Sequence, residues 1–364
     1  MRINQLSLTN FRSYQQLDLS FKPGVTTFLG DNGSGKTNIA EALIYLSFLS
    51  SHRVSSNQPL INLGHEQAVI RAEIEKDGRL LQVDLEINAN KANRAKLNQN
   101  ATRSQREILG ALQVIYFSPE DLDLVRGDPS TRRDFLDKLL VTRSPRLAGV
   151  ISDYERVVKQ RNALLKTRTT QSALAPWNEQ LVSIGATLTA ERIGLVEVLN
   201  PHIQKSYANL NEVKPAEIFY KSTVENISTN IEKNKEIYEG KILEVHQQEI
   251  ERGLTLFGPH RDDLQLQLGP FPAKGYASHG ESWSMAIALR LGSFNLLKKE
   301  GAEPILILDD IFAELDNSRR QQLLNATTMA EQTIITAAVS SDIPEGLAGK
   351  RKFVSLGQVT EGSA

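Results

Sequence analysis

Apolar and polar residues alternate with the period of a β-strand in the N-terminal part of the chain. Segments with this alternation, or with compact β-branched composition, are residues 2–8, 16–21, 25–29, 68–75 and 80–87. After Gly30 the apolar residues change to helical spacing, which holds over residues 37–49. The last two strand-like segments flank Lys76-Asp77-Gly78-Arg79, whose Asp-Gly pair indicates a hairpin turn. The pattern therefore predicts an N-terminal region of strands with one helix among them.

The middle of the chain has mainly helical periodicity, over residues 131–209 and again over residues 227–250. Prolines are expected to break the first of these stretches at Pro145, Pro176 and Pro201. Strand-like segments are also present at residues 216–223, 254, 264–268, 305–308, 333–336 and 353–356. No heptad repeat is sustained, so we do not expect a long coiled coil.

These patterns, with the length of the chain, predict how its domains are organised. The chain has 364 residues, enough for two domains, and its 40% hydrophobic and 23% charged content is ordinary for a globular protein. We expect an α/β fold with mixed sheets and helices, in which both ends of the chain build one head. The head would take residues 1–125 and 251–364, and a mainly helical second domain would be inserted at residues 126–250.

Charge and cysteine content exclude several function classes. The formal net charge is −1, so a surface that binds nucleic acid must be a local basic patch. The chain has no cysteine, which excludes disulfides, thiolate metal sites and cysteine nucleophiles. Residues 1–6 lack an apolar signal region, and no apolar run approaches the ~18 residues of a membrane span. We therefore expect a cytoplasmic protein without a membrane partner.

The first candidate for chemistry is a phosphate loop that fits G-x-x-x-x-G-K-[ST] in full. It consists of Gly30, Asp31, Asn32, Gly33, Ser34, Gly35, Lys36 and Thr37. Glycines let the backbone approach a phosphate closely, and the following helix directs its N-terminal N–H groups at the anion. Lys36 is expected to reach the β- and γ-phosphates, and the Thr37 hydroxyl is expected to hold Mg²⁺. The sequence thus predicts an ATP and Mg²⁺ site.

A phosphate loop needs an acidic partner at the end of a buried strand. Residues 305–308 are four consecutive apolar residues, which suit a central parallel strand, and Asp309 and Asp310 follow them. We expect Asp309 to hold Mg²⁺ together with Thr37. Asp310 is expected to act as the general base for the attacking water.

Two segments near these carboxylates resemble motifs of the ABC ATPases. Ala313-Glu314-Leu315-Asp316 resembles the D-loop, and Ser278-His279-Gly280-Glu281, which precedes a helical stretch, resembles the signature sequence. This resemblance implies that Ser278 and Gly280, at a helix N-terminus, face the γ-phosphate held by a second subunit. ATP would then join two copies of the chain head to tail.

Further segments resemble the RecF family within the ABC and SMC-like ATPases. They are residues 119–137, 307–323, Asn10-Phe11-Arg12-Ser13-Tyr14 and Gly258-Pro259-His260-Arg261-Asp262-Asp263. The resemblance implies a recombination mediator that binds single-stranded DNA and gapped or junction duplexes, dimerises with ATP, and works with RecR and RecO to load RecA. It also implies a weak, DNA-stimulated ATPase that acts as a switch. Arg12 and Arg53 would contact the nucleotide.

The chain departs from the common ABC pattern at three places. Glu281 stands where the signature usually has a neutral amide, and Asp310 stands where a glutamate usually follows the Walker B aspartate. The usual switch histidine is absent, and Thr336 is our candidate for its catalytic position. A Q-loop is not clear, although residues 118–120 lie in a plausible position. The shorter side chain of Asp310 is consistent with slow hydrolysis.

A basic stretch between Lys91 and Arg106 contains no acidic residue and no aromatic residue. Arg94, Lys96 and Arg103 are the candidates for DNA contact, and their composition suits phosphate contacts more than base stacking. Rival basic patches are Arg132, Arg133 and Lys138, and the helical set Arg156, Lys159, Arg161, Lys166 and Arg168. Each of these sets could also be a solvated surface.

Two other functions share the phosphate loop. The ATPase subunit of a membrane transporter would not be expected to carry the helical insert or the motif at residues 119–137. A small-molecule kinase would not need Ser278 near a partner's phosphate, and it would transfer phosphate to an acceptor. Dimerisation that depends on ATP, and phosphate release without a phosphorylated acceptor, would distinguish the recombination mediator from these two functions.

Overall fold

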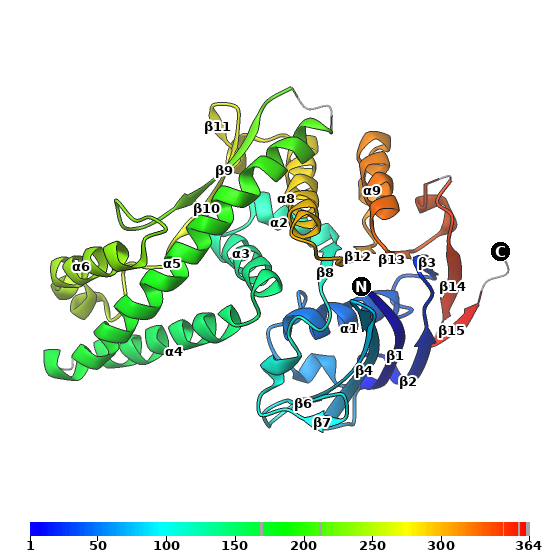
Figure 1. Ribbon diagram of the computed structural model, residues 1–364, viewed down its shortest axis with the longest axis horizontal. Coiled ribbons are helices and arrows are strands. Elements are labelled where there is room, and N and C mark those ends of the chain that lie inside the picture. The colour runs from blue at the N-terminus through cyan, green and yellow to red at the C-terminus, as the bar shows by residue number, and fades with distance from the viewer. Residues whose placement is uncertain (168–169, 211–212, 345, 356, 362–364) are drawn as a thin grey trace. The chain divides into compact units, whose positions relative to one another are not determined.

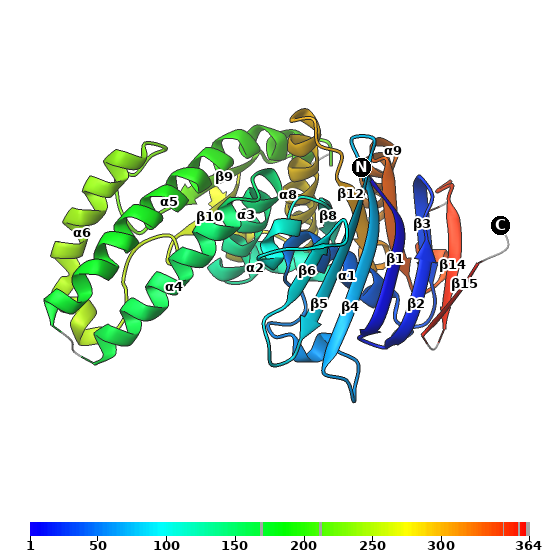
Figure 2. The same cartoon turned by 60° about the horizontal axis from the view of Figure 1, so that its bottom comes forward.

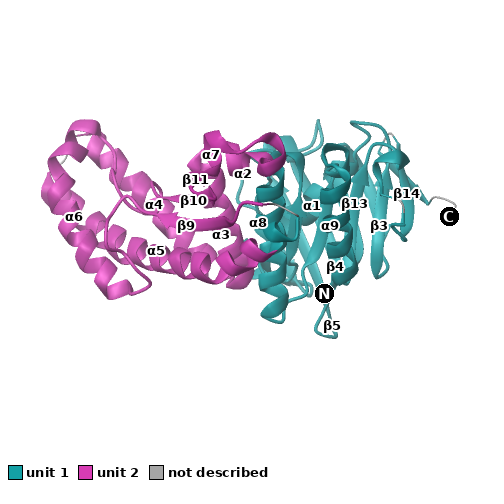
Figure 3. Ribbon diagram, turned by 90° about the horizontal axis from the view of Figure 1, so that it is seen from above, with its two compact units in different colours: residues 1–121, 206–212, 283–364 teal, residues 122–205, 213–282 magenta. Residues whose placement is uncertain are grey.

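The computed structural model describes residues 1–167, 170–210, 213–344, 346–355 and 357–361 (Figure 1). They form two compact units, which Figure 3 shows in different colours. Unit 1 consists of residues 1–121, 206–212 and 283–364, and unit 2 consists of residues 122–205 and 213–282. In the described part of the chain, no helix has both the length and the apolar character that a membrane crossing requires.

Unit 1 contains an antiparallel sheet with strand order β2-β1-β4-β5-β6-β7, seen in Figure 2. Its strands are β1 (Arg2–Phe11), β2 (Tyr14–Ser20), β4 (Gln67–Lys76), β5 (Arg79–Asn88), β6 (Arg94–Leu97) and β7 (Asn100–Ala101). Alternate residues of β4 are buried, as its apolar alternation predicts. The β4–β5 hairpin turns at Asp77 and Gly78, and both residues have the positive φ that such turns need.

The second sheet of unit 1 has strand order β15-β14-β3-β13-β12-β8. Its strands are β3 (Gly24–Leu29), β8 (Val114–Phe117), β12 (Ile305–Asp309), β13 (Gln332–Ala337), β14 (Lys350–Ser355) and β15 (Gln358–Glu361). All neighbouring strands are parallel except the β14–β15 pair. β12 is buried at every position, as expected for a central strand that is covered on both faces.

One hydrophobic cluster connects the two sheets of unit 1. It contains apolar residues of β1, β4 and β5, of helix α1 (Lys36–Phe48), and of β12 and β13. The remaining described helical segments of unit 1 are η1 (Gln58–Leu60), η2 (Gln105–Ile108), η3 (Pro119–Asp121), η4 (Phe312–Glu314), α9 (Asn317–Met329), η5 (Ser340–Asp342) and most of α8 (His279–Lys299). The phosphate loop therefore enters a helix that packs within a shared core.

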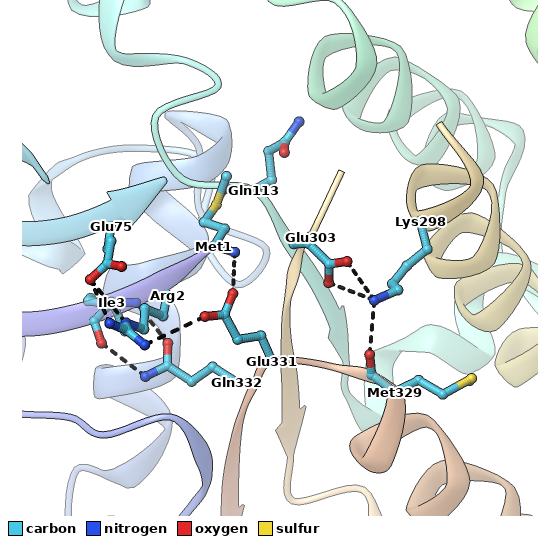
Figure 4. Close-up of polar contacts among 10 residues, drawn as sticks. All are labelled: Met1, Arg2, Ile3, Glu75, Gln113, Lys298, Glu303, Met329, Glu331 and Gln332. Atoms are coloured by element: carbon cyan, nitrogen blue, oxygen red, sulfur yellow. Dashed lines mark hydrogen bonds and ion pairs between the residues drawn. The ribbon is translucent and has the colours of Figure 1, made fainter. Parts of the chain in front are cut away.

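A buried amide also ties the two sheets together (Figure 4). The Gln332 side chain, fully buried, accepts a hydrogen bond from the backbone N–H of Ile3 at 2.8 Å and donates to the Ile3 carbonyl at 2.9 Å. Beside it, the α-amino group of Met1 lies 2.5 Å from the Glu331 carboxylate. These bonds hold the start of β1 against the start of β13, and so the N-terminal sheet is fixed to the strand that carries Thr336.

Unit 2 is mainly helical but also contains a small antiparallel sheet. Its helices are α2 (Leu122–Arg126), α3 (Pro129–Arg143), α4 (Leu147–Lys166), α5 (Gln171–Ala208, which enters unit 1 at residue 206), α6 (Ile231–Arg252) and α7 (Ala273–Tyr276), and its strands are β9 (Ala216–Lys221), β10 (Asp263–Leu268) and β11 (Phe271–Pro272). The predicted break at Pro145 agrees with the end of α3 and the start of α4.

The predicted breaks at Pro176 and Pro201 are wrong, because both prolines lie inside the continuous helix α5. A proline removes one backbone donor and usually kinks or ends a helix. Here the apolar face of α5, with Leu195, Leu199 and Ile203 buried, favours the continued helix. The single strand-like position at Leu254 also lies outside the strands, in the turn after α6.

The domain division differs from the predicted boundary at residue 250, because residues 251–282 belong to unit 2. β10 pairs along its whole length with β9, from Asp263 opposite Lys221 to Leu268 opposite Ala216. A sequence interval of about forty residues separates these strands, and periodicity alone does not report such pairing. Residues 206–212 fall in unit 1, although they were expected in the inserted domain.

Candidate functional site

The phosphate loop of unit 1 connects β3 to α1, as the motif requires. Two of its glycines leave no room for a side chain. A Cβ atom on Gly30 would lie 2.2 Å from the Val354 carbonyl oxygen, and one on Gly35 would lie 2.7 Å from the Tyr14 hydroxyl. Gly35 also has a φ of 114°, which disfavours other residues. The tip of the loop, Asp31, Asn32 and Gly33, is exposed.

Lys36 and Ser34 have the features expected of a phosphate cradle. Lys36 is 3% exposed, and its Nζ donates to the Asp31 carbonyl at 3.1 Å. The buried Ser34 hydroxyl has no hydrogen-bond partner among the residues the structure describes. No side chain caps the N-terminus of α1, so its first N–H groups are left for an anion to bind. A buried cation, an unpaired hydroxyl and a helix N-terminus together fit a triphosphate.

The acidic residues meet Thr37 at the ends of the parallel strands. The Thr37 hydroxyl lies 3.5 Å from Oδ2 of Asp310, and Asp309 ends β12 next to Thr336 of β13. Burial raises the pKa of Asp309 to about 6, partly opposed by its hydrogen bond from Thr336. A cation beside this carboxylate would favour its ionised form again. The donor set of Thr37 and Asp309 consists of oxygens, which suits Mg²⁺.

Thr336 connects the two aspartates. Its side chain is fully buried, its Oγ1 donates to Oδ1 of Asp309 at 2.5 Å, and it accepts from the backbone N–H of Asp310 at 2.9 Å. These contacts give the hydroxyl a positioning role toward both aspartates. Thr336 was predicted as a catalytic residue, and the structure places its hydroxyl on the Asp309 carboxylate and on the backbone of the predicted general base, Asp310.

Asp310 has an unusual backbone conformation, with a φ of 48°. Its N–H also bonds to the Thr336 carbonyl at 3.2 Å, so the β13 strand end holds this conformation. Aspartate and asparagine are the non-glycine residues that best tolerate positive φ. Such conformations are costly and concentrate at functional sites, which agrees with a fixed position for this carboxylate next to Thr37.

Arg12 lies in unit 1 near the loop, but its guanidinium already has partners. Its Nε and Nη2 donate to the two oxygens of Glu41, at 2.8 and 2.6 Å, and its Nη1 donates to the Pro59 carbonyl at 2.8 Å. Glu41 is fully buried in α1 and also accepts from Ser51. Arg53 lies 3.6 Å from the same carboxylate. Glu41 was not among the predicted site residues. Its charge within the apolar stretch of α1 is the sequence feature that could have indicated a buried ion pair.

The signature segment lies at the start of α8, within unit 2. Ser278 and His279 are exposed, and Gly280 is half-buried. The Ser278 hydroxyl accepts from the Glu281 N–H at 3.2 Å, and Glu281 accepts from the Ser278 N–H at 2.8 Å. This reciprocal pair is a capping box that fixes the helix N-terminus. The carboxylate of Glu281 therefore turns back onto the helix.

A second missed feature lies after β8, where the Q-loop was expected. Asp121, which is buried, forms an ion pair with Arg290 of α8 at 2.7 Å, and the Arg290 guanidinium lies 4.1 Å from the centre of the Tyr116 ring. The two charges are 169 residues apart in sequence. Ser118, at the end of β8, follows Phe117, which pairs with Leu308 one residue before Asp309.

The predicted DNA contacts Arg94 and Lys96 lie on the exposed face of β6, with Ala95 buried between them. Each faces an acid on β5, because Glu86 pairs with Arg94 and Asp84 pairs with Lys96. Cross-strand neighbours of opposite charge offset each other in part. Arg103 is also exposed, outside the strands.

Part of the rival basic patches forms internal ties, whereas Arg156, Lys159 and Lys166 are exposed. Arg132 forms two hydrogen bonds with Asp263, at 2.8 and 2.9 Å, and Arg133 donates to the Asp262 carbonyl at 2.8 Å. Arg161 is fully buried against Glu249 at 2.5 Å. Arg168 lies outside the described residues. Arg132, Arg133 and Arg161 thus help to hold unit 2 together, and the helical set loses only Arg161 from its exposed described members.

The chain is similar to proteins of known type over almost its whole length. The family model described as the RecF/RecN/SMC N terminal domain matches residues 2–353. A DNA replication and repair protein RecF of Streptomyces avermitilis is 48% identical, with 99% of each chain covered. The protein of the same name from Cutibacterium acnes is 47% identical, covering 99% of this chain and 98% of its own.

Solved structures agree with these relatives. A structure described as the recombination mediator protein RecF-ATPrS in the RecFOR pathway has a TM-score of 0.91 and 25% identity, covering 100% of this chain and 98% of that one. A second, described as RecF-ATP, has a TM-score of 0.89 at 25% identity, with 99% of each chain covered. An Smc head at 17% identity and a TM-score of 0.58, covering 100% of this chain and 98% of its own, shares the fold. The predicted ATPase-head fold is confirmed.

Proposed function

The chain belongs to the RecF/RecN/SMC N-terminal domain family, among its RecF members, and we propose that it is an ATP-dependent DNA-binding recombination mediator. The observation that carries this proposal is the site of unit 1, where Thr37 of the phosphate loop meets Asp309 and Asp310 at the strand ends. The names of the relatives describe DNA replication and repair, and two similar structures are described with ATP or ATPrS. Both support an ATP-binding repair protein.

In this proposal the residues of the phosphate loop hold the triphosphate. Lys36 neutralises its charge, the N–H groups of α1 bind its oxygens, and the Ser34 hydroxyl gains a partner. Thr37 and Asp309 hold Mg²⁺, which supplies charge neutralisation at the phosphates. Arg12 is tied to Glu41 of α1, the helix that follows the loop. Each of its three side-chain nitrogens already donates once, so Arg12 contacts the nucleotide only through its remaining N–H groups.

Hydrolysis is slow and serves as a release switch. Asp310 orients the attacking water and accepts its proton, and Thr336 fixes the backbone of Asp310 and the carboxylate of Asp309. The Asp310 side chain is one methylene shorter than that of a glutamate, so its carboxylate reaches less far from the fixed backbone. A weak ATPase stimulated by DNA would time the release of the protein from DNA.

The second half of each pocket comes from another copy of the chain. The exposed α8 N-terminus, with Ser278 and Gly280, offers hydrogen-bond donors to the triphosphate bound by the partner. ATP thus joins two copies, and the dimer would bind single-stranded DNA and gapped or junction duplexes. With RecR and RecO it would aid RecA loading, as the description of the similar structures as mediators in the RecFOR pathway supports.

Ser278→Arg tests the shared pocket. The variant is expected to bind ATP normally but to dimerise at least about tenfold more weakly, because a long side chain occupies the face offered to the partner. Light scattering with saturating ATP measures the dimer, and equilibrium binding measures the nucleotide affinity. Ser172→Arg, at an exposed serine of α5, is the matched control and should dimerise like the parent. Normal dimerisation of Ser278→Arg would reject the shared pocket.

Charge reversal of Arg94, Lys96 and Arg103 to glutamate tests the proposed DNA surface. We expect the affinity for gapped DNA to fall by about tenfold or more at moderate salt, and the dependence of binding on salt to weaken, because phosphate contacts release counterions. The ATP affinity should stay unchanged. A control with the same charge change, Lys205, Lys233 and Lys299 to glutamate, uses exposed lysines elsewhere. Equal losses in both variants would mean that net charge, and not this surface, governs binding.

A further inference from the structure

The signature segment has an additional charged partner, Lys214, which sequence patterns did not indicate. Its Nζ lies 2.6 Å from Oε1 of Glu281. The other oxygen of the same carboxylate accepts from the Ser278 N–H, and so Lys214, Glu281 and Ser278 form a continuous polar chain within unit 2. The hydrogen bonds from Lys214 and then from Ser278 lower the pKa of Glu281 to about 2. Glu281 therefore carries a full negative charge at neutral pH.

The backbone around Lys214 is fixed by the small sheet. The Gly269 N–H donates to the Pro215 carbonyl at 2.8 Å, and β9 begins at the next residue. The stem of Lys214 lies over Gly269, where an added Cβ would meet it at 3.9 Å. Lys214 thus projects from a fixed position in the same unit, although 67 residues separate it from Glu281 in sequence.

Glu281 has two opposing effects on the signature helix. Its capping interaction orders Ser278, and the capping box uses only a lone pair of the Ser278 hydroxyl, so the hydroxyl proton stays available to an acceptor. The N–H groups of His279 and Gly280 likewise have no acceptor among the described residues. However, a carboxylate at a helix N-terminus also cancels the attraction of that N-terminus for another anion, such as a phosphate. An uncompensated Glu281 would repel a partner's triphosphate.

We propose that Lys214 is a positioning residue of the shared pocket, which cancels the charge of Glu281 so that Ser278, His279 and Gly280 can receive the triphosphate bound by a second copy of the chain. This inference rests on the proposed ATP-dependent dimer. It assigns Lys214 no contact with the nucleotide. An exposed ion pair contributes little to stability, and the 51% exposed Lys214 side chain is no exception, so the effect is expected on dimerisation and not on folding.

The charge of Glu281 can be removed independently, which makes a double-variant test possible. In the full-length protein with a slowly hydrolysed ATP analogue, Lys214→Ala is expected to weaken dimerisation about tenfold, because each dimer has two such sites and an exposed charge pair contributes a few-fold. Lys214→Arg should dimerise like the parent. Adding Glu281→Gln to Lys214→Ala should restore dimerisation to within about threefold of the parent, since no charge then needs to be cancelled.

Sedimentation velocity measures the dimer, and nucleotide affinity and thermal unfolding are measured for each variant. Unchanged dimerisation of Lys214→Ala overturns the inference. A double variant as weak as Lys214→Ala also overturns it, since Lys214 would then act by direct phosphate contact or by shaping the loop. A parent protein that stays monomeric would instead refute the proposed dimer itself, and this inference with it. Recovery in the double variant is the result we expect.

Discussion

Lys36→Ala is expected to weaken ATP binding by at least about 100-fold, because a hydrogen bond from a buried cation to a phosphate is lost together with its charge. Lys36 is 3% exposed, and its Nζ bonds to the Asp31 carbonyl within the loop. One hydrogen bond to a carbonyl offsets little of the free-energy cost of burying the Lys36 charge. Removing this charge should therefore not destabilise the nucleotide-free protein. The loss is therefore expected in ligand binding, with the thermal midpoint of the free protein unchanged or raised.

Equilibrium binding of labelled ATP measures this effect, and light scattering should show that the variant no longer dimerises with ATP. Lys22→Ala is the matched control, because Lys22 is an exposed lysine of the same unit that precedes β3. It should bind ATP like the parent. If Lys36→Ala kept its ATP affinity within about threefold of the parent, the assignment of the loop as the triphosphate site would be wrong.

The sequence predicted the local parts of the site because their chemistry is local. Close backbone approach to phosphate needs glycines at fixed spacing, and a metal site at a strand end needs a carboxylate after a buried run. The structure accordingly brings Thr37 together with Asp309 and Asp310 in unit 1. The strand alternation of β4 and β5 was readable for the same reason, since each face of a strand is decided by neighbouring residues.

Long-range ties were not predictable in this way. Arg12 with Glu41, Asp121 with Arg290, and Lys214 with Glu281 are pairs whose members lie far apart in sequence. No periodicity reports which acid meets which base, and an isolated charge is usually solvated. The continuous helix α5 failed prediction for a related reason, because tertiary packing overrides the local cost of its two prolines. The boundary at residue 250 was misplaced because β10 pairs with a distant strand.

Asp310→Asn is expected to reduce ATP hydrolysis by at least about 100-fold while ATP binding and dimerisation persist, because general-base catalysis contributes 10²–10⁴-fold. The substitution suits this position, since asparagine tolerates the positive φ of 48° nearly as well as aspartate. Its backbone N–H keeps both bonds to Thr336, and its side chain keeps an oxygen for Thr37. Phosphate release in a single turnover measures hydrolysis, and dimer lifetime after ATP dilution should lengthen in proportion.

Two comparisons separate the loss of the base from a loss of structure. Asp310→Ala should lose hydrolysis equally but unfold at lower temperature, because alanine lacks the side-chain hydrogen bonding that favours positive φ. Asp309→Asn should instead weaken Mg²⁺-dependent ATP binding, since this carboxylate lies beside Thr37 and is held by Thr336. If Asp310→Asn hydrolysed ATP within about threefold of the parent rate, the attacking water would be activated by another group, and Asp310 would only hold the strand end in place.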